Sequence, residues 1–208
     1  DLQAALRNDT GLVSLMHVNN ETGIIQPLEE YAEVLADHPA YFHTDAAQGF
    51  GKDIERLQNK RIDLVSVSGH KIYAPKGIGA LMVRYRREEG RVPVGPLMYG
   101  GGQERGVRPG TTAVALVAGL GLASWKATAE HAHRHSRRQQ SLAALTSLLE
   151  NVDASINGDV ARNIGTAASV TLPGVDSESL MLLLRDEIAI SSGSACTSAE
   201  QRRSHVLV

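Results

Sequence analysis

The segment that best indicates the fold is Ser68-Gly69-His70-Lys71-Ile72-Tyr73-Ala74-Pro75-Lys76-Gly77-Ile78-Gly79. Its glycines, proline and lysines are typical of a turn. Apolar runs on either side, at residues 62–67 and 79–83, are typical of strands. We therefore expect two strands joined by a turn that carries Lys71 close behind the first strand.

Elements upstream of this segment extend the pattern. Residues 12–18 and 41–44 are expected to be strands, and between them Pro27 suits the first turn of a helix whose apolar stripe reaches Leu35. This strand, helix, strand order predicts an α/β fold with a mainly parallel sheet. Ligands bind at the carboxyl ends of the strands in such sheets. The polar residues that follow the strands here are Asn20, Asp45 and Ser68 to Lys71.

A long helical stretch is expected downstream, from Ala113 towards Glu150. Thr111 or Thr112 could cap its beginning, and a stretch of this length is expected to break at least once. Short elements follow: a strand at residues 168–172, a helix at 177–186 and a strand at 188–191.

These elements divide the chain into two parts. We expect residues 1–129 to be part of a large ligand-binding domain and residues 130–208 to be part of a smaller α+β domain. The sequence begins without an initiator Met in what resembles the inside of a helix, and it ends within an apolar run, so we expect the chain to be a piece of a longer protein.

Composition predicts a globular protein with a small ligand. The 42% hydrophobic content of the 208 residues can fill a core. With 21 basic and 23 acidic residues the formal net charge is -2, which gives no electrostatic basis for binding nucleic acid or anionic lipid. No apolar run approaches the roughly 18 residues that span a bilayer. Residues 1–10 lack the pattern of a signal peptide, so a cytoplasmic protein is expected.

Lys71 has the surroundings of a lysine that forms a Schiff base, since it follows a strand among small residues and hydrogen-bond donors. Such a lysine must be neutral to attack a carbonyl, and burial or nearby positive charge favours that form. Ser68 and His70 could bind an anion such as a cofactor phosphate. The alternative is that Lys71 is a solvated loop lysine.

Asp45 follows a strand whose side chains are expected to be buried. An ionised carboxylate in such a place needs a positive partner to offset its desolvation, and a protonated pyridine nitrogen would serve. The alternative is that Asp45 caps a short helix that begins at Ala46. Gln48 could reach the same edge of a ligand.

Cys196 is the single cysteine of the chain and lies in the run Ser191-Ser192-Gly193-Ser194-Ala195-Cys196-Thr197-Ser198. One cysteine excludes an internal disulfide framework. Its neighbours are small, so the thiol is expected to be accessible. Reactive cysteines need such access, whereas structural ones are more often buried among apolar residues.

Together these segments resemble successive motifs of the cysteine desulfurases, in the aminotransferase class V branch of fold-type I pyridoxal-phosphate enzymes. The resemblance extends over nearly the whole chain. Its motifs are His17 to Gly23, His43 to Gln48, Ser68 to Gly79, Gly100 to Thr111 and Ser191 to Ser198.

The resemblance implies pyridoxal 5'-phosphate as cofactor. Lys71 would hold it as an internal aldimine, and Asp45 would pair with its ring nitrogen. Ser68 and His70 would bind its phosphate. The residues implied on the ring hydroxyl side are Asn20 and Gln48, and Thr111 would reach the phosphate of the other subunit of a homodimer.

The implied activity converts L-cysteine to L-alanine. Lys71 would carry the α-proton of the substrate, and Cys196 would take its sulfur as a persulfide and pass it to an acceptor protein. The form of the cysteine segment resembles the branch that supplies iron-sulfur cluster assembly and thiolation. Alternatives are a selenocysteine lyase or transaminase of the same class, and a truncated, non-catalytic scaffold for sulfur transfer.

Some expected parts are missing from the sequence. Family members carry a phosphate-binding turn and a ring-stacking histidine upstream, and an arginine for the substrate carboxylate downstream. Arg202 and Arg203 are too close to Cys196 to be assigned that task. His131 and His135 share a helix face and could bind a metal, but the arginines around them favour a solvated cationic face, and no metal site is predicted.

Overall fold

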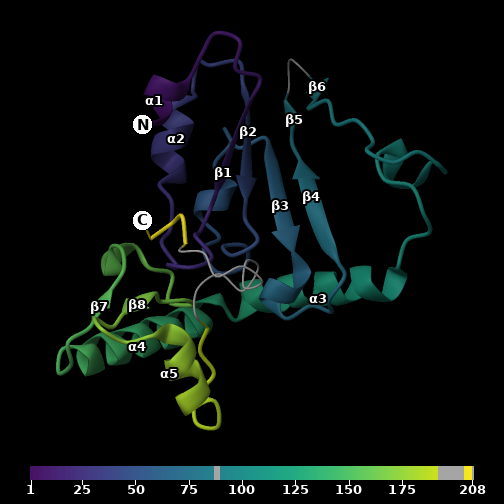
Figure 1. The fold of residues 1–208 in the computed structure, drawn as a ribbon. Coiled ribbons are helices and arrows are strands. Elements are labelled where there is room, and N and C mark those ends of the chain that lie inside the picture. Colours follow the sequence, from purple (N-terminus) through teal and green to yellow (C-terminus); the bar gives the residue numbers. More distant parts are fainter. Residues whose placement is uncertain (87–89, 192–203, 208) are drawn as a thin grey trace. The chain divides into compact units, whose positions relative to one another are not determined.

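The computed structural model describes residues 1–86, 90–191 and 204–207 (Figure 1). The chain forms two compact units. The first comprises Asp1–His17 and Gln26–His131, and the second comprises Val18–Ile25 and the described residues from Ala132 onward. The division into domains at residues 129 and 130 stays a prediction.

The first unit is built on a four-stranded sheet. Its strands β1 (Leu12–Met16), β2 (Tyr41–Asp45), β3 (Leu64–Ser68) and β4 (Gly79–Val83) lie side by side in that order (Figure 1). The pairs β1–β2 and β2–β3 are parallel, and β4 is antiparallel to β3. The expectation of an α/β fold with a mainly parallel sheet is confirmed.

Strand β4 matches its predicted range, and the other three strands match theirs to within two residues. Within the first unit the remaining elements are short apart from α3: α1 (Leu2–Ala5), α2 (Leu28–Val34), η1 (Arg56–Gln58), η2 (Gly69–Ile72), β5 (Tyr85–Arg86), β6 (Gly90–Arg91), η3 (Gln103–Gly106) and α3 (Val114–Ala129).

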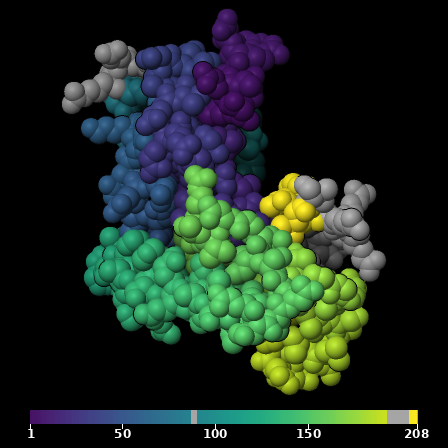
Figure 2. Space-filling view, turned by 90° about the vertical axis from the view of Figure 1, so that its left-hand side faces the viewer, coloured from purple at the N-terminus to yellow at the C-terminus, as the bar shows by residue number. Residues whose placement is uncertain are grey.

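The main core lies between α2 and one face of the sheet. Leu28 and Leu35 from the helix region pack with Phe42 and Val65 from the strands, and Phe42 is fully buried. The spacing of the apolar residues explains this contact, because it puts them on one side of the helix. Figure 2 shows the outer surface of this part of the unit, coloured purple to blue.

A second core holds the connection between β3 and β4. Ile72 and Ala74 from this connection pack with Ala123 of α3. Helix α3 runs past the edge at which the arrow of β3 ends (Figure 1). The expected cap at Thr111 or Thr112 is wrong: the N-cap is Ala113, which makes no side-chain hydrogen bond.

The helical stretch breaks at Glu130, as expected, and α4 (His131–Leu149) follows. His131 is half-buried, and its Nε2 lies 3.1 Å from the carbonyl oxygen of Lys52. His131 therefore departs from the expected solvated face, because its ring nitrogen donates to a backbone carbonyl, whereas His135 on the same face is exposed.

The second unit contains short elements after α4: β7 (Ser155–Ile156), η4 (Val160–Arg162), β8 (Val170–Thr171) and α5 (Ser177–Leu184). The helix expected at residues 177–186 is confirmed. The strand expected at 188–191 is wrong, since these residues pair with no strand of the described chain. In none of the described ranges is a helix long and apolar enough to cross a membrane.

We expect Phe42→Ala to lower the free energy of unfolding by about 3–5 kcal/mol, because it leaves a cavity in the main core. Urea denaturation of the natural gene product measures this loss. Leu97→Ala serves as a control, since Leu97 is 98% exposed and its loss leaves no cavity. An equal effect of both substitutions would contradict the assignment of the core.

Candidate active site

The carboxyl ends of the three parallel strands meet at one edge of the sheet. Met16 lies opposite Asp45, and Asp45 lies opposite Ser66. Backbone hydrogen bonds continue past the strand ends: the amide of His17 donates to the carbonyl oxygen of Asp45 (2.8 Å), and that of Ala46 donates to Ser66 (3.0 Å). Because β3 leads directly into the turn with Lys71, the predicted site residues Asp45 and Ser68 to Lys71 lie at the same edge.

Lys71 lies in the 3₁₀ turn η2, which backbone contacts hold tightly. The amide of Gly69 donates to the carbonyl oxygen of Ile78 at 2.9 Å. A Cβ atom at Gly69 would lie 2.9 Å from that same oxygen, so only glycine allows the approach. Tyr73 ends the turn in the left-handed region, with φ of 69°. The turn is therefore a fixed support for Lys71.

Burial differs along this turn in a way that suits a binding site. Ile72 is 3% exposed and anchors the turn in the second core, whereas Lys71 is half-buried. Ser68 Oγ lies 3.0 Å from His70 Nδ1, so the two side chains form a pair on either side of Gly69. A hydroxyl and an imidazole are able to donate to an anion.

Asp45 is exposed, so the expectation that it is buried is wrong. Its Oδ1 accepts a hydrogen bond from the amide of Ala47 at 2.9 Å. The local bond of the capping alternative is therefore present, although turns rather than a helix follow it. Within the part of the chain that the structure describes, Oδ2 has no such local partner, which leaves the exposed acid suited to pair with a cationic group.

The other predicted residues lie in three different places. Gln48 is half-buried in the turn after Asp45, and its backbone carbonyl oxygen accepts a hydrogen bond from Lys52 Nζ at 2.9 Å. Asn20 is an exposed residue of the second unit, and Thr111 is an exposed residue before α3. Cys196 lies outside the described residues, so its place stays a prediction.

A chain of polar contacts that begins at a buried histidine lies next to this edge and received no role in the sequence analysis. His17 is fully buried, and its Nε2 lies 3.0 Å from Asp53 Oδ2. Arg56 contacts the same oxygen at 2.9 Å and Glu29 at 3.2 Å. Burial raises the pKa of Asp53, but the hydrogen bonds from His17 and Arg56 outweigh it and hold that pKa below its usual value. A histidine directly after an apolar strand was the signal available in the sequence.

A row of polar side chains crosses the face of the sheet that lies opposite the main core. His43 Nδ1 lies 2.7 Å from Ser14 Oγ, and its Nε2 lies 3.1 Å from Ser66 Oγ. Burial holds the pKa of His43 below its usual value, against an opposing effect of the Asp45 carboxylate. The row therefore favours a neutral imidazole between the two hydroxyls.

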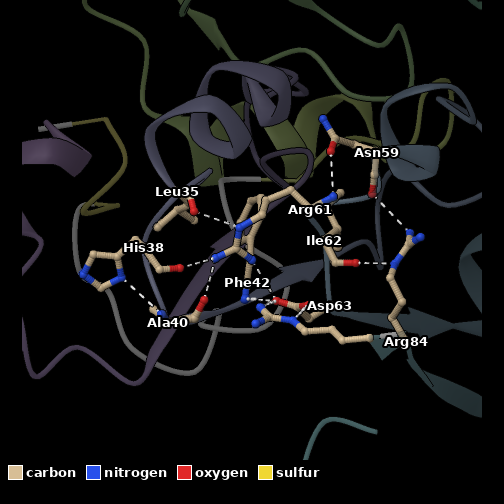
Figure 3. Close-up of polar contacts among 10 residues, drawn as sticks. Leu35, His38, Ala40, Phe42, Asn59, Arg61, Ile62, Asp63 and Arg84 are labelled. Carbon is tan, nitrogen blue, oxygen red and sulfur yellow. Dashed lines mark hydrogen bonds and ion pairs between the residues drawn. The ribbon is translucent and has the colours of Figure 1, made fainter. Parts of the chain in front are cut away.

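A charged cluster lies at the opposite edge, where β2 and β3 begin (Figure 3). Asp63 is 3% exposed and accepts from Arg61 (2.9 Å), Arg86 (2.7 Å) and the amide of Phe42 (2.8 Å). Arg61 also donates to the carbonyl oxygens of Leu35, His38 and Ala40. Burial raises the pKa of Asp63, but the hydrogen bonds from Arg86 and Phe42 and the two guanidinium charges hold it below its usual value.

A surface hollow at this edge is lined by residues that include Lys60, Arg61, Asp63, Arg84 and Arg86. Arg84 donates to the carbonyl oxygens of Ile62 and Asn59. Because these guanidinium groups bond to the protein itself, we assign the hollow a structural role and place the candidate site at the Lys71 edge.

The Lys71 edge is the edge at which α/β sheets bind small molecules, and comparison with known proteins gives the family. The model of the family described as "Aminotransferase class-V" matches residues 1–206. The chain belongs to this family.

Relatives named as cysteine desulfurases align with nearly the full length of this chain. It is 47% identical to "Cysteine desulfurase, mitochondrial" of Arthroderma benhamiae, covering 100% of this chain and 41% of the relative. It is 44% identical to "Cysteine desulfurase IscS" of a Shewanella species, covering 99% of the chain and 50% of the relative. The chain thus spans about half the length of the curated relatives it matches.

A solved structure agrees with the fold. The crystal structure of DndA from Streptomyces lividans superposes with a TM-score of 0.82 and 46% sequence identity, covering 89% of this chain and 52% of DndA. An α/β fold of this kind is therefore established for the chain.

The expectation of a cytoplasmic protein is contradicted. The relatives from Arthroderma benhamiae, Eremothecium gossypii and Saccharomyces cerevisiae are named mitochondrial cysteine desulfurases. Charge and hydropathy do not separate the two compartments, because a globular enzyme needs a similar polar surface in both.

We expect Asp63→Asn to lower the free energy of unfolding by about 3–5 kcal/mol at neutral pH, because it leaves two guanidinium groups without their buried anion. Asp63 has a folded pKa below its ordinary value of 3.8, so its contribution is present above that value and is lost as pH falls through the folded pKa. Urea denaturation should give the same difference in unfolding free energy between the natural protein and Asp63→Asn at pH 7 and pH 5. At pH 3 this difference should be smaller.

Asp9→Asn is the matched control, because the ion pair of Asp9 with Arg7 is exposed. Its unfolding midpoint should stay near that of the natural protein. A gap for Asp63→Asn that already shrinks between pH 7 and pH 5 would contradict the assigned ionisation.

Proposed function

We propose that the whole protein is a pyridoxal-phosphate-dependent cysteine desulfurase. It converts L-cysteine to L-alanine and moves the sulfur through a persulfide on Cys196 to an acceptor protein. The observation that carries this proposal is the fixed turn that holds Lys71 at the same sheet edge as Asp45. The names of the relatives support the same activity.

The residues at this edge fit the cofactor of the family. Aminotransferase class V proteins and cysteine desulfurases are pyridoxal-phosphate enzymes. That cofactor has an aldehyde, a phosphate and a pyridine nitrogen. Lys71 supplies an amine for the aldehyde. Ser68 and His70 supply hydrogen-bond donors for the phosphate, and Asp45 supplies an exposed carboxylate for the pyridine nitrogen. The donor set therefore matches the three polar groups.

Other residues would complete the cofactor contacts. Asn20 and Gln48 are proposed on the ring hydroxyl side. Thr111 is exposed before α3, and we propose that it reaches the phosphate bound by the other subunit of a homodimer.

When bound, the cofactor supplies an electron sink that weakens bonds to the substrate α-carbon. Asp45 keeps that sink effective by holding a proton on the ring nitrogen. Lys71 Nζ, once released, takes the α-proton and returns a proton to the substrate carbon. The fixed η2 turn would hold the backbone of Lys71 in place, and a fixed position of the acid–base group makes such proton transfer efficient.

The sulfur transfer balances without an external oxidant. The thiolate of Cys196 forms a bond to the substrate sulfur as the bond between that sulfur and the β-carbon breaks. The β-carbon is reduced to the methyl group of alanine, and the sulfur is oxidised to the persulfide level. The acceptor then takes this outer sulfur and leaves the Cys196 thiolate free. Iron-sulfur cluster assembly and thiolation are the uses we propose for it.

The decisive experiment is mass spectrometry of the Cys196 peptide after the natural gene product is incubated with pyridoxal phosphate and L-cysteine. We expect the peptide to gain one sulfur. Lys71→Ala should lower the rate of this gain at least about a thousandfold, because the amine acts directly in the reaction. Lys76→Ala is the matched control, since Lys76 is an exposed lysine of the same connection and should behave as the natural protein.

Each alternative predicts a different result. An unmodified Cys196 in a protein that binds the cofactor would favour a transaminase or a selenocysteine lyase. A gene product that neither binds the cofactor nor gains sulfur would favour a non-catalytic scaffold and would overturn the proposal.

A further inference from the structure

His17 is a buried polar residue that the proposed reaction does not use. It directly follows β1, and its side chain is fully buried. Its backbone is tied on both sides: its amide donates to the carbonyl oxygen of Asp45 (2.8 Å), and its carbonyl oxygen accepts from Gln26 (2.8 Å). Burying an imidazole ring without a hydrogen bond lowers the stability of the fold, so the contacts of this ring are informative.

The ring of His17 lies against the turn that follows Asp45. Its Nε2 lies 3.0 Å from Asp53 Oδ2, near the end of that turn. A Cβ atom at Gly49, in the middle of the turn, would lie 2.0 Å from His17 Nδ1. Only glycine therefore lets the turn close over the ring.

Contacts within the turn transmit this support. The amides of Gly49 and Phe50 both donate to the carbonyl oxygen of Ala46, and the amide of Asp53 donates to that of Gly49. Fixing Gly49 and Asp53 therefore fixes the whole turn from 46 to 53.

The hydrogen bonds indicate which ring nitrogen carries the proton. Asp53 is an anion that also binds Arg56 at 2.9 Å, so Nε2–H of His17 is the donor. Among the residues that the structure describes, Nδ1 has no hydrogen-bond partner, and it faces Gly49.

We propose that His17 is a positioning residue that holds the turn from 46 to 53, and through it Asp45 and Gln48, in the geometry needed at the cofactor. Asp45 directly precedes this turn and its carbonyl oxygen accepts from the amide of His17, and Gln48 directly precedes the glycine that packs on the ring. This inference rests on the proposed function for the roles of Asp45 and Gln48.

The test compares His17→Leu with His17→Gln in the natural gene product loaded with pyridoxal phosphate. Leucine fills space but cannot donate to Asp53, whereas the glutamine amide is able to donate. For His17→Leu we expect kcat to fall about tenfold with KM changed less than twofold, because misplaced groups lower the rate of the chemical step. His17→Gln should recover most of kcat.

A spectroscopic measurement separates positioning from general stability. The visible absorbance of bound pyridoxal phosphate is titrated with pH in each variant, since Asp45 and Gln48 set the protonation of the bound group. We expect a shifted midpoint in His17→Leu and a natural midpoint in His17→Gln. Leu35→Ala is the matched control: it weakens the main core but leaves the bond between His17 and Asp53 in place, so the midpoint should not move although the melting temperature falls.

Hydrogen exchange tests whether the bond between His17 and Asp53 holds the turn from 46 to 53, without reference to activity. Amides of Gly49, Phe50 and Asp53 should exchange at least about tenfold faster in His17→Leu, because the turn opens locally. Asp53→Ala removes the same bond from the other side and should give the same result if His17→Leu fails to fold.

The outcomes distinguish the two proposals. Unchanged exchange and an unchanged absorbance midpoint in both His17→Leu and Asp53→Ala would overturn the role of His17. A natural protein that shows no cofactor band and no persulfide, but whose turn opens in these variants, would overturn the proposed function and leave the bond between His17 and Asp53 with a structural role.

Discussion

The parallel pairing of β1, β2 and β3 is the constraint on which the site depends. Parallel strands run in one direction, so each residue that follows a strand arrives at the same edge. The ladder continues past the strands through the bonds from His17 to Asp45 and from Ala46 to Ser66. These bonds align the beginnings of three connections, and one of them carries Lys71. A shift of one residue in either pairing would turn Asp45 or Ser68 to the other face of the sheet.

The two edges of this sheet use their carboxylates differently. Asp63 is buried, and arginines and a backbone amide bind it from several sides, so it ties together the chain segments that enter the sheet. Asp45 is exposed and has one local hydrogen bond to Ala47. A carboxylate whose acceptor positions are filled has little capacity for a ligand, whereas an exposed one retains it. The difference in hydrogen bonding of the two carboxylates therefore supports a structural role for the Asp63 edge and the proposed chemistry for the Asp45 edge.

Sequence patterns predicted the strands of the first unit because alternating or continuous apolar residues report burial directly. They failed where tertiary context decides. Residues 188–191 are apolar but find no partner strand in the described chain, and Thr111 lies too far before Val114 to cap α3. Burial of Asp45 was inferred from its strand, yet it is the last residue of that strand and lies at the edge. The roles predicted for Asn20, Gln48 and Thr111 came from the family resemblance, because the residue pattern alone did not assign them.

His17 and Gly49 show why the support of a site is harder to predict than its chemistry. Lys71, Asp45 and Cys196 are recognisable because their side chains can react or bind. His17 has its effect through a single bond to Asp53, and Gly49 through the absence of a side chain. These two residues are separated by a helix and a strand in the sequence, and only the folded sheet brings them together. A reactive group is identified by its own chemistry, but a positioning residue is defined by a distance to another residue, which a single sequence does not contain.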